Sequence, residues 1–197
     1  AFRAFARKLA VVYVAPLKAL VAERMADLRQ RYGEMRAVEL TGDSAPVRSQ
    51  LASADWIVAT PEKFDVSTRR WEADDAHFLR RVGLVVLDEI HLLGEDRGGS
   101  LEVLVSRLRY VGSKTGRDIR IVGLSTALSN AQDVGTWLSP RTLVFNFRPA
   151  VRPLQLEVHV RGFAGKHFYP RMASMNKPIF QAIDLHSSEK PVLVFVA

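Results

Sequence analysis

The chain has 197 residues, of which 48% are hydrophobic and 25% charged, a composition ordinary for a soluble globular protein with a sizeable core. It contains no cysteine, which excludes disulfides and thiolate zinc sites, and no apolar stretch approaches the roughly 18 residues of a membrane span. The net charge of +7 and isoelectric point near 10.0 allow an anionic partner such as nucleic acid, although the positive charges are scattered rather than gathered in one run.

Short apolar runs alternate with amphipathic helical stretches along the first three quarters of the chain. In chain order the sequence predicts a strand at residues 11–14, a helix at 17–32, a strand at 38–40, a helix at 46–54, a strand at 57–59, a helix ending at 78–81, a strand at 84–87, a helix at 101–111, a strand at 119–124, a helix at 130–138 and a strand at 143–147. Short apolar strands separated by helices are typical of a parallel sheet covered on both faces. The predicted fold class is therefore α/β.

The pattern changes near residues 148–153, which contain two prolines and predict a domain boundary. Beyond it, apolar and polar residues alternate over 154–160 as in a strand, and a helix at 178–185 and a strand at 192–196 follow. We expect a first domain at 1–147, a linker at 148–153 and the start of a second domain at 154–197. Because the chain starts without methionine and stops at a predicted strand, we also expect it to be part of a longer protein.

Two adjacent carboxylates, Asp88 and Glu89, follow the apolar run that ends at Leu87. Ligands of a parallel sheet collect beyond the carboxyl ends of its strands, where a carboxylate can hold Mg²⁺ against phosphate oxygens. The neighbouring carboxylate can then orient or deprotonate a water molecule. The dipeptide alone favours a solvated strand end, with the aspartate capping the next turn, so the other strand ends must decide between the two interpretations.

Polar clusters also follow the other predicted strands. They are Ala15-Pro16-Leu17-Lys18, Thr41-Gly42-Asp43, Thr60-Pro61-Glu62-Lys63 and Ser125-Thr126-Ala127. Thr60 as N-cap with Pro61 in the first turn predicts a helix start, whose free backbone N–H groups can hold a phosphate. Lys63 or Lys18 can add positive charge there. Each cluster taken alone is also typical of an ordinary turn or a capped helix.

The order of these clusters resembles a known family. The segments APLKAL, TGD, TPEKFD, DEIH and STA resemble motifs Ia, Ib, Ic, II and III of the Ski-like branch of helicase superfamily two. The segments GLSTALSNAQDVGTWL, FNFRPAVRPLQLEVHVRGF, RMASMNKP and PVLVFVA are similar to the C-terminal cassette of the large members that carry two helicase cassettes in tandem. The resemblance implies an incomplete first RecA-like domain to residue 147, lacking its P-loop strand, and the N-terminal part of a second from residue 154.

The resemblance also implies ATP and Mg²⁺ as cofactors. Asp88 would bind Mg²⁺ directly or through water, and Glu89 would polarise the water that attacks the γ-phosphate. His91 would couple this site to the nucleic-acid side through Ser125, Thr126 and Ala127. That role of His91 is implied by the family, because a polar residue after a strand is also satisfied by local contacts.

A second set of residues would contact the backbone of a nucleic-acid strand. It comprises Pro16, Leu17, Lys18, Thr41, Gly42, Asp43, Thr60, Pro61, Glu62 and Lys63. Because such contacts go to phosphate and sugar, we expect binding to single-stranded or partly duplex DNA or RNA that is independent of sequence and sensitive to salt. The resemblance further implies an intracellular protein, in the nucleus or alternatively the cytosol, that joins other subunits in a larger complex and uses no membrane.

The chain departs from a complete motor at the phosphate loop. It has no G-x-x-x-x-G-K-[ST] segment, and Gly112-Ser113-Lys114-Thr115 is predicted to be a helix-to-strand loop instead. In the family that loop lies upstream of motif Ia, so residues 1–9 resemble the tail of the helix that follows it. The arginines that reach the phosphates would lie beyond residue 197. We therefore expect residues 1–197 alone to hydrolyse ATP negligibly.

Three functions compete at this point. The first is part of an ATP-dependent helicase that moves 3′ to 5′ along one strand. The second is a catalytically silent helicase cassette that serves as a protein-interaction platform, which the intact Asp88-Glu89 pair disfavours. The third is a P-loop ATPase that is not a helicase, such as a transporter motor, which leaves the Thr60-Pro61-Glu62-Lys63 segment unexplained.

Overall fold

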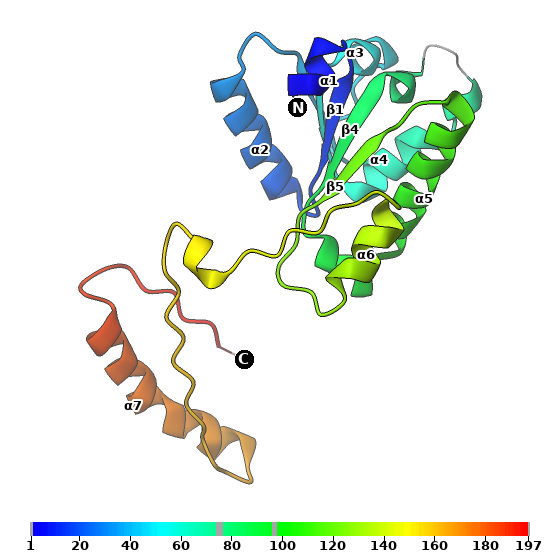
Figure 1. Ribbon diagram of the computed structural model, residues 1–197. Helices are drawn as coiled ribbons and strands as arrows, with labels where there is room; N and C mark the ends of the chain where they lie inside the picture. Colours follow the sequence, from blue (N-terminus) through cyan, green and yellow to red (C-terminus); the bar gives the residue numbers. More distant parts are fainter. Residues whose placement is uncertain (1, 74–76, 96–97, 197) are drawn as a thin grey trace. The chain divides into compact units, whose positions relative to one another are not determined.

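The computed structural model describes residues 2–73, 77–95 and 98–196, and the chain divides into two compact units, Ala1–Asn146 and Phe147–Ala197. The first unit contains a five-stranded sheet in which every strand is parallel to its neighbours (Figure 1). The strands are β1 (Ala10–Val14), β2 (Ala37–Leu40), β3 (Trp56–Ala59), β4 (Val82–Leu87) and β5 (Arg120–Gly123), in the order β2-β3-β1-β4-β5 across the sheet.

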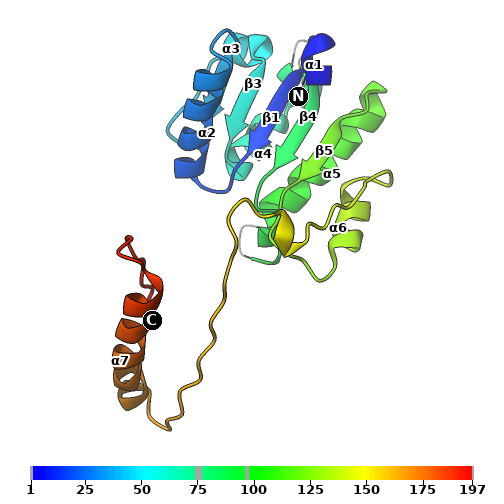
Figure 2. The same ribbon diagram turned by 60° about the vertical axis from the view of Figure 1, so that its left-hand side comes forward.

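Helices of the first unit cover both faces of this sheet. They are α1 (Phe2–Ala6), α2 (Lys18–Arg31), α3 (Arg48–Ser53), α4 (Pro61–Thr68), α5 (Gly98–Thr115) and α6 (Ala131–Leu138), with 3-10 turns η1 (Trp71–Ala73), η2 (Phe78–Arg81) and η3 (Ile90–Gly94). Figures 1 and 2 show α2 on one face of the sheet and α4 and α5 on the other. The predicted α/β class, with a parallel sheet between helices, is confirmed.

The two faces of the sheet have separate cores because successive side chains of a strand point to opposite sides. On one face, Val11 and Val58 pack with Val21 and Met25 of α2. On the other face, alternate residues of β1, β3 and β4 pack against a stripe of α5, formed by Leu101, Leu104, Val105, Leu108 and Val111. Strands β1 and β3 are almost wholly buried, which is why their sequences read as continuous apolar runs.

The central strands end at one level, and this brings their following residues together. In the register of β1 and β4, Val14 lies opposite Leu87. Strand β3 ends alongside them, since Ala59 pairs with Val14 on one side and with Leu40 of β2 on the other. The residues that follow these strands therefore share one edge of the sheet, which is the edge where an α/β protein binds its ligands.

Two predictions, one in the first unit and one at its boundary with the second, are wrong. Residues 143–147 form no strand in the structure, and Leu143 and Phe145 there are 76% and 72% exposed. An apolar run becomes a strand only when a neighbouring strand takes up its backbone hydrogen bonds. Residues 112–115 lie in the last turns of α5 rather than in a loop, so this segment offers no phosphate-binding turn.

The second unit departs further from prediction. It contains the 3-10 turn η4 (Pro149–Val151) and the helix α7 (Phe168–His186), and the stretches predicted as strands at 154–160 and 192–196 are not in strand conformation. Helix α7 begins ten residues before the predicted start at Pro178, because Met172, Met175, Ile179 and Ile183 keep helical spacing across that proline. The assignment of this unit to a second RecA-like domain stays a prediction.

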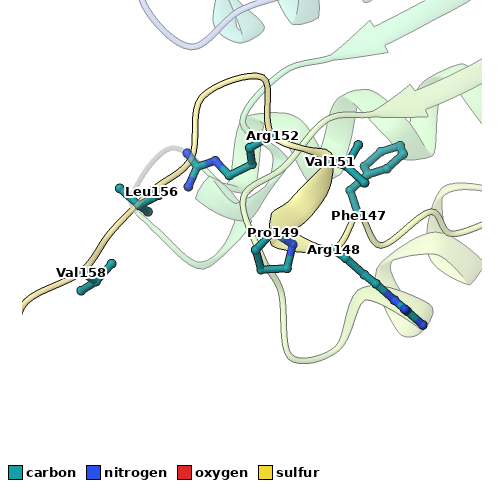
Figure 3. Close-up of a pocket in the computed structure, with 7 residues that line it drawn as sticks. All are labelled: Phe147, Arg148, Pro149, Val151, Arg152, Leu156 and Val158. Atoms are coloured by element: carbon teal, nitrogen blue, oxygen red, sulfur yellow. The ribbon is translucent and has the colours of Figure 1, made fainter.

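One open, mainly apolar hollow lies within the second unit (Figure 3). It is lined by Phe147, Arg148, Pro149, Val151, Arg152, Leu156 and Val158. None of these belongs to the predicted site residues, and Figure 3 shows Arg148 extending away from Arg152 rather than converging with it. The hollow has no set of polar groups that would fix a small ligand. In the part of the chain that the structure describes, no helix has the length and apolar character to cross a membrane.

Candidate functional site

The acidic pair stands at the carboxyl end of β4, at the level where β1 also ends. The backbone N–H of Asp88 donates to the carbonyl of Val14 at 2.9 Å, which fixes the pair against the end of β1. One carboxylate oxygen of Asp88, Oδ1, accepts the N–H of Glu89 at 3.0 Å. The other, Oδ2, accepts a hydrogen bond from the hydroxyl of Tyr13 in β1. Both oxygens of the predicted magnesium ligand are therefore oriented by the protein.

Tyr13 is a site residue that the motifs do not identify. Burial raises its pKa, and the hydrogen bond to Asp88 and that carboxylate's charge raise it further, to about 12, although Arg24 acts in the opposite direction. The hydroxyl consequently stays protonated and acts as the donor. A signal was present in the sequence: Tyr13 is the single polar group in an apolar strand, and a buried tyrosine hydroxyl usually finds a partner.

Glu89 has an unusual backbone conformation. Its φ is 52°, in the left-handed region that non-glycine residues rarely adopt, and it immediately precedes the turn η3. The structure holds it there because Ile90 is buried and its N–H donates to the carbonyl of Leu124, beyond β5, at 2.9 Å. Strain of this kind persists where surrounding contacts determine the backbone, and such places are often functional.

His91 lies between the acidic pair and the segment after β5. Its Nδ1 is 3.3 Å from Oε2 of Glu89 and accepts the backbone N–H of Thr126 at 3.4 Å. A single ring nitrogen cannot donate to Glu89 and accept from Thr126 at once, so the two contacts require different protonation states of Nδ1. The structure thus brings His91 to Thr126, with the exposed Ser125 and Ala127 on either side of it.

The turn η3 is in contact with the long helix α5. Gly98, the first residue of α5, is buried against the carbonyl of Leu93, so tightly that a β-carbon would overlap that group. Only glycine fits this contact without moving the backbone. The strand β4, the acidic pair, η3 and α5 are therefore joined with little room for displacement.

The ends of β1, β2 and β3 carry the predicted nucleic-acid residues. Thr41 and Thr60 are buried, and the N–H of Thr60 donates to the carbonyl of Leu40 at 3.2 Å, which places the two segments side by side. Lys18 and Asp43 form an exposed ion pair, with Nζ 2.7 Å from Oδ2. Because Asp43 partly neutralises Lys18, a phosphate must compete with it for that lysine.

The helix start at Thr60 is confirmed in position but not in detail. Thr60 is the N-cap and Pro61 the first residue of α4, yet the threonine hydroxyl makes no capping hydrogen bond. Glu62 is exposed and Lys63 partly exposed in the first turn. Of the residues predicted after β1 and β2, Leu17 and Gly42 are exposed and Pro16 is buried, and a β-carbon on Gly42 would lie 3.6 Å from Nζ of Lys18.

A buried ion cluster, which we call the Asp65 cluster, anchors α4 to α5. Asp65 is 5% exposed and receives hydrogen bonds from Arg107 of α5 and from Arg69, the latter at 2.7 Å, while Arg107 also donates to Thr68 at 2.9 Å. Burial raises the pKa of Asp65, but the hydrogen bonds and charges of the two arginines outweigh it and hold the pKa below its usual value. The sequence offered no signal for this cluster beyond the residues themselves.

The acidic pair suits a magnesium ion that also touches phosphates. In the described parts of the chain, no three His, Asp or Glu side chains gather as a complete metal cage. Mg²⁺ seldom uses such a cage, since it usually keeps several waters and takes one or two carboxylates plus substrate phosphates. Asp88 and Glu89, part-buried at a strand end, are a donor set of that kind.

Comparison with known proteins agrees with this geometry. Residues 2–134 match the family model of the DEAD/DEAH box helicases. Activating signal cointegrator 1 complex subunit 3 is 54% identical over 191 residues in Danio rerio, covering 95% of this chain and 12% of that protein. The Homo sapiens protein is 54% identical over 190 residues, covering 94% of this chain and 8% of the relative.

An Arabidopsis thaliana protein named DExH-box ATP-dependent RNA helicase DExH14 is 52% identical over 191 residues, covering 95% of this chain and 9% of that protein. The chain thus spans about a tenth of the length of these relatives. The identities confirm the resemblance to Ski-like helicases, and to the helicase subunit of the activating signal cointegrator complex, that the motifs indicate. Which cassette of such a protein the chain represents stays a prediction.

Solved structures show the same fold. The helicase MrfA, in a crystal structure bound to DNA, superimposes with a TM-score of 0.58 at 17% identity, covering 69% of this chain and 20% of that chain. A second structure of MrfA, bound to DNA and AMPPNP, gives a TM-score of 0.56 at 18% identity. At this identity the likeness shows the fold alone, and together with the parallel sheet it confirms the expected RecA-like α/β fold.

Proposed function

The chain belongs to the DEAD/DEAH box helicase family, and we propose that it supplies the magnesium-holding and water-activating half of an ATP-driven motor that moves along nucleic acid. One observation carries the proposal. The acidic pair after β4 is joined through His91 to the segment after β5, on the same sheet edge where Lys18 and the start of α4 stand.

The acidic pair would divide the chemistry between its two carboxylates. Asp88, with Oδ1 and Oδ2 oriented by Glu89 N–H and Tyr13, would hold Mg²⁺, which neutralises charge on the β- and γ-phosphates. Glu89 would accept a hydrogen bond from the attacking water and draw off its proton. Its backbone, held at φ 52° with the help of the contacts of Ile90, fixes the point from which the Glu89 side chain leaves the main chain.

His91 would couple hydrolysis to movement. Its Nδ1 faces both Glu89 and the N–H of Thr126, and it can serve only one of these partners at a time. A change at Glu89 during hydrolysis would therefore alter the hold on the segment Ser125-Thr126-Ala127. His91 can therefore adopt two distinct states, bonded to Glu89 or to Thr126, and coupling between two sites requires distinct states of this kind.

Backbone phosphates would be bound at the ends of β1, β2 and β3. The start of α4 stands at this edge with Thr60 as its N-cap and Pro61 as its first residue, and Lys63 and Lys18 supply positive charge. Because these groups contact phosphate and sugar, binding should be independent of base sequence. Either DNA or RNA can satisfy it, and movement along one strand in the 3′ to 5′ direction is part of the proposal.

The setting is also proposed from the relatives. Two of them are named as a subunit of the activating signal cointegrator 1 complex, and we infer that the full-length protein works with other subunits inside the cell, in the nucleus or the cytosol. ATP is the proposed nucleotide, in keeping with the printed name of the Arabidopsis relative.

The test is an Asp88→Asn substitution in the full-length protein. Nucleic-acid-stimulated ATP hydrolysis should fall by about 10²-fold or more, because an amide is a poor ligand for a hard cation. Asp118→Asn, at an exposed position between α5 and β5, is the control. Strand separation should be compared on duplexes with a 3′ or 5′ overhang, made of DNA and of RNA.

The outcomes separate the competing functions. Loss of hydrolysis and of strand separation together supports a motor in this cassette. Unchanged hydrolysis in Asp88→Asn would favour a silent cassette that serves as an interaction platform. Hydrolysis that no nucleic acid stimulates would favour an ATPase of another class.

A further inference from the structure

The carboxylate of Asp88 is held by two donors, one in the turn after β4 and the other in β1. The N–H of Glu89 reaches Oδ1 at 3.0 Å, and the hydroxyl of Tyr13 reaches Oδ2 across 75 positions of sequence. Two donors on two oxygens stop the carboxyl group from rotating about its bond to Cβ. Of these donors, the N–H of Glu89 would be present with any residue at position 89 except proline, whereas the hydroxyl at position 13 depends on tyrosine.

The ring of Tyr13 is itself held in place. It packs in the cluster of Val11, Trp56 and Val58 on the α2 face of the sheet, and its hydroxyl points to the strand end. The guanidinium of Arg24, in the second turn of α2, lies 5.3 Å from the ring centroid. Packing alone would be satisfied by phenylalanine, so the hydroxyl serves its polar neighbours, of which Asp88 accepts its hydrogen bond and Arg24 is the other.

The position of Arg24 connects this contact to the nucleic-acid side. Arg24 and Lys18 belong to the same helix, whose first residue is Lys18. A displacement of α2 when Lys18 meets a phosphate would move Arg24 over the Tyr13 ring. The path from Lys18 to Asp88 therefore runs through one helix, one cation–π contact and one hydrogen bond.

We propose that Tyr13 is a positioning residue that orients Asp88 for magnesium, and that Arg24 links this orientation to helix α2. The proposal rests on the proposed function and adds a residue to its site. Carboxylates that ligate a metal are commonly hydrogen-bonded by a second group, and loss of such a partner typically lowers metal affinity or activity by about 10- to 100-fold.

The experiment measures metal binding directly. In the full-length protein, Mn²⁺ replaces Mg²⁺ as the probe and is titrated by electron paramagnetic resonance in the presence of a non-hydrolysable ATP analogue. Tyr13→Phe should weaken Mn²⁺ binding by about 10-fold or more, and the Mg²⁺ concentration for half-maximal hydrolysis should rise in parallel. The affinity for a single strand without nucleotide should stay unchanged, since the hydroxyl that the substitution removes donates to Asp88, which is not a predicted nucleic-acid residue.

A matched control and a second variant keep the test decisive. Tyr32→Phe removes a hydroxyl from a tyrosine in the same cluster, stacked on Trp56, and should leave Mn²⁺ affinity as it is. Arg24→Met keeps the Tyr13 hydroxyl but removes the cation above its ring, and should weaken Mn²⁺ binding by only about two- to fivefold. Arg24→Met also provides the test if Tyr13→Phe fails to fold.

The results distinguish the proposal from the function on which it rests. Unchanged Mn²⁺ affinity in a folded Tyr13→Phe protein would overturn the role of Tyr13 and leave the proposed function standing. If that variant does not fold, unchanged affinity in Arg24→Met would overturn the proposal. Absence of Mn²⁺ binding by the unsubstituted protein would contradict the proposed function and Tyr13's role together.

Discussion

The two halves of the sheet edge are built differently. At the ends of β4 and β5, Asp88 is tied to Tyr13 of β1, and Ile90 and His91 are tied to Leu124 and Thr126 in the segment after β5. At the ends of β1, β2 and β3, Thr41 and Thr60 are buried, while Lys18 and Asp43 face solvent as an exposed ion pair. The first half is preorganised, and the second is free to adapt.

This difference matches the two tasks proposed for the edge. Charge that develops during phosphate cleavage is best stabilised by groups that need no rearrangement. A moving strand must instead be held and released in turn, so exposed side chains with weak partners serve better. On the nucleic-acid half, helix α4 is fixed to α5 by the buried Asp65 cluster, while the side chains at the start of α4 stay adaptable.

The largest effect should come from Glu89→Gln, which tests the preorganised half of the sheet edge, at the ends of β4 and β5. Because an amide cannot take a proton from water, ATP hydrolysis by the full-length protein should fall by about 10²- to 10⁴-fold. Binding of single strands should change little, and a phosphate-release assay with a binding titration measures both. Glu23→Gln on the exposed face of α2 is the control. A rate above a tenth of normal would exclude Glu89 as the group that activates water.

The next largest effect should come from Arg107→Leu, which removes the main link between α5 and Asp65 of α4, the helix that supports the nucleic-acid half of the edge. Asp65 would then remain buried with only Arg69 beside it, and breaking a buried pair in this way lowers the free energy of unfolding by about 3 to 5 kcal/mol. Urea denaturation followed by circular dichroism measures it. Arg29→Leu on exposed α2 should stay within about 0.5 kcal/mol. Equal effects of the two substitutions would show that the cluster does not anchor α4.

The Asp65 cluster also predicts a dependence on pH. The pKa of Asp65 is lowered in the folded state. The ionised carboxylate therefore stabilises the fold above the ordinary pKa of about 3.9, and this stabilisation is lost as the pH falls through the pKa of Asp65 in the folded protein. The stability difference between the unsubstituted chain and Arg107→Leu should therefore narrow below about pH 4. Urea curves at a series of pH values check this, and a difference that widens in acid would contradict it.

A smaller effect is expected from Lys63→Ala on the adaptable half. Affinity for single strands should fall similarly for all sequences, and the slope of log affinity against log salt should shrink by about 1 in magnitude. Lys114→Ala, near the end of α5 and over the ring of Tyr110, is the control for removing one positive charge. If the slope of log affinity against log salt is the same in Lys63→Ala and in the unsubstituted protein, Lys63 does not contact a phosphate of the strand.

The smallest effect should come from Asp43→Asn, which frees Lys18 from its exposed partner. An exposed ion pair contributes about 1 kcal/mol at most, so single-strand affinity should rise by no more than about fivefold at low salt. Fluorescence anisotropy at low and high salt measures the gain, which should vanish at high salt. Weaker binding would mean that Asp43 itself contacts the nucleic acid.

Much of the first unit was predictable because its strands are short, apolar and parallel. The five strands, and the helices at 17–32, 101–111 and 130–138, were expected close to their observed bounds. Beyond β5 the predictions at 143–147, 154–160 and 192–196 were wrong, since alternating or apolar runs need a partner strand and the described residues supply none. Pro178 misled the helix prediction because helical spacing continues across it.

The sequence by itself determined which polar clusters follow which strands, because parallel strands carry their carboxyl ends to one edge whatever their order. Only the tertiary structure decided that β1 lies beside β4, and with it that Tyr13 meets Asp88 across 75 residues and Arg107 meets Asp65 across 42. Such contacts depend on strand order and helix packing. No local pattern encodes these, because each partner lies in a separate element whose own sequence reads as ordinary core or surface.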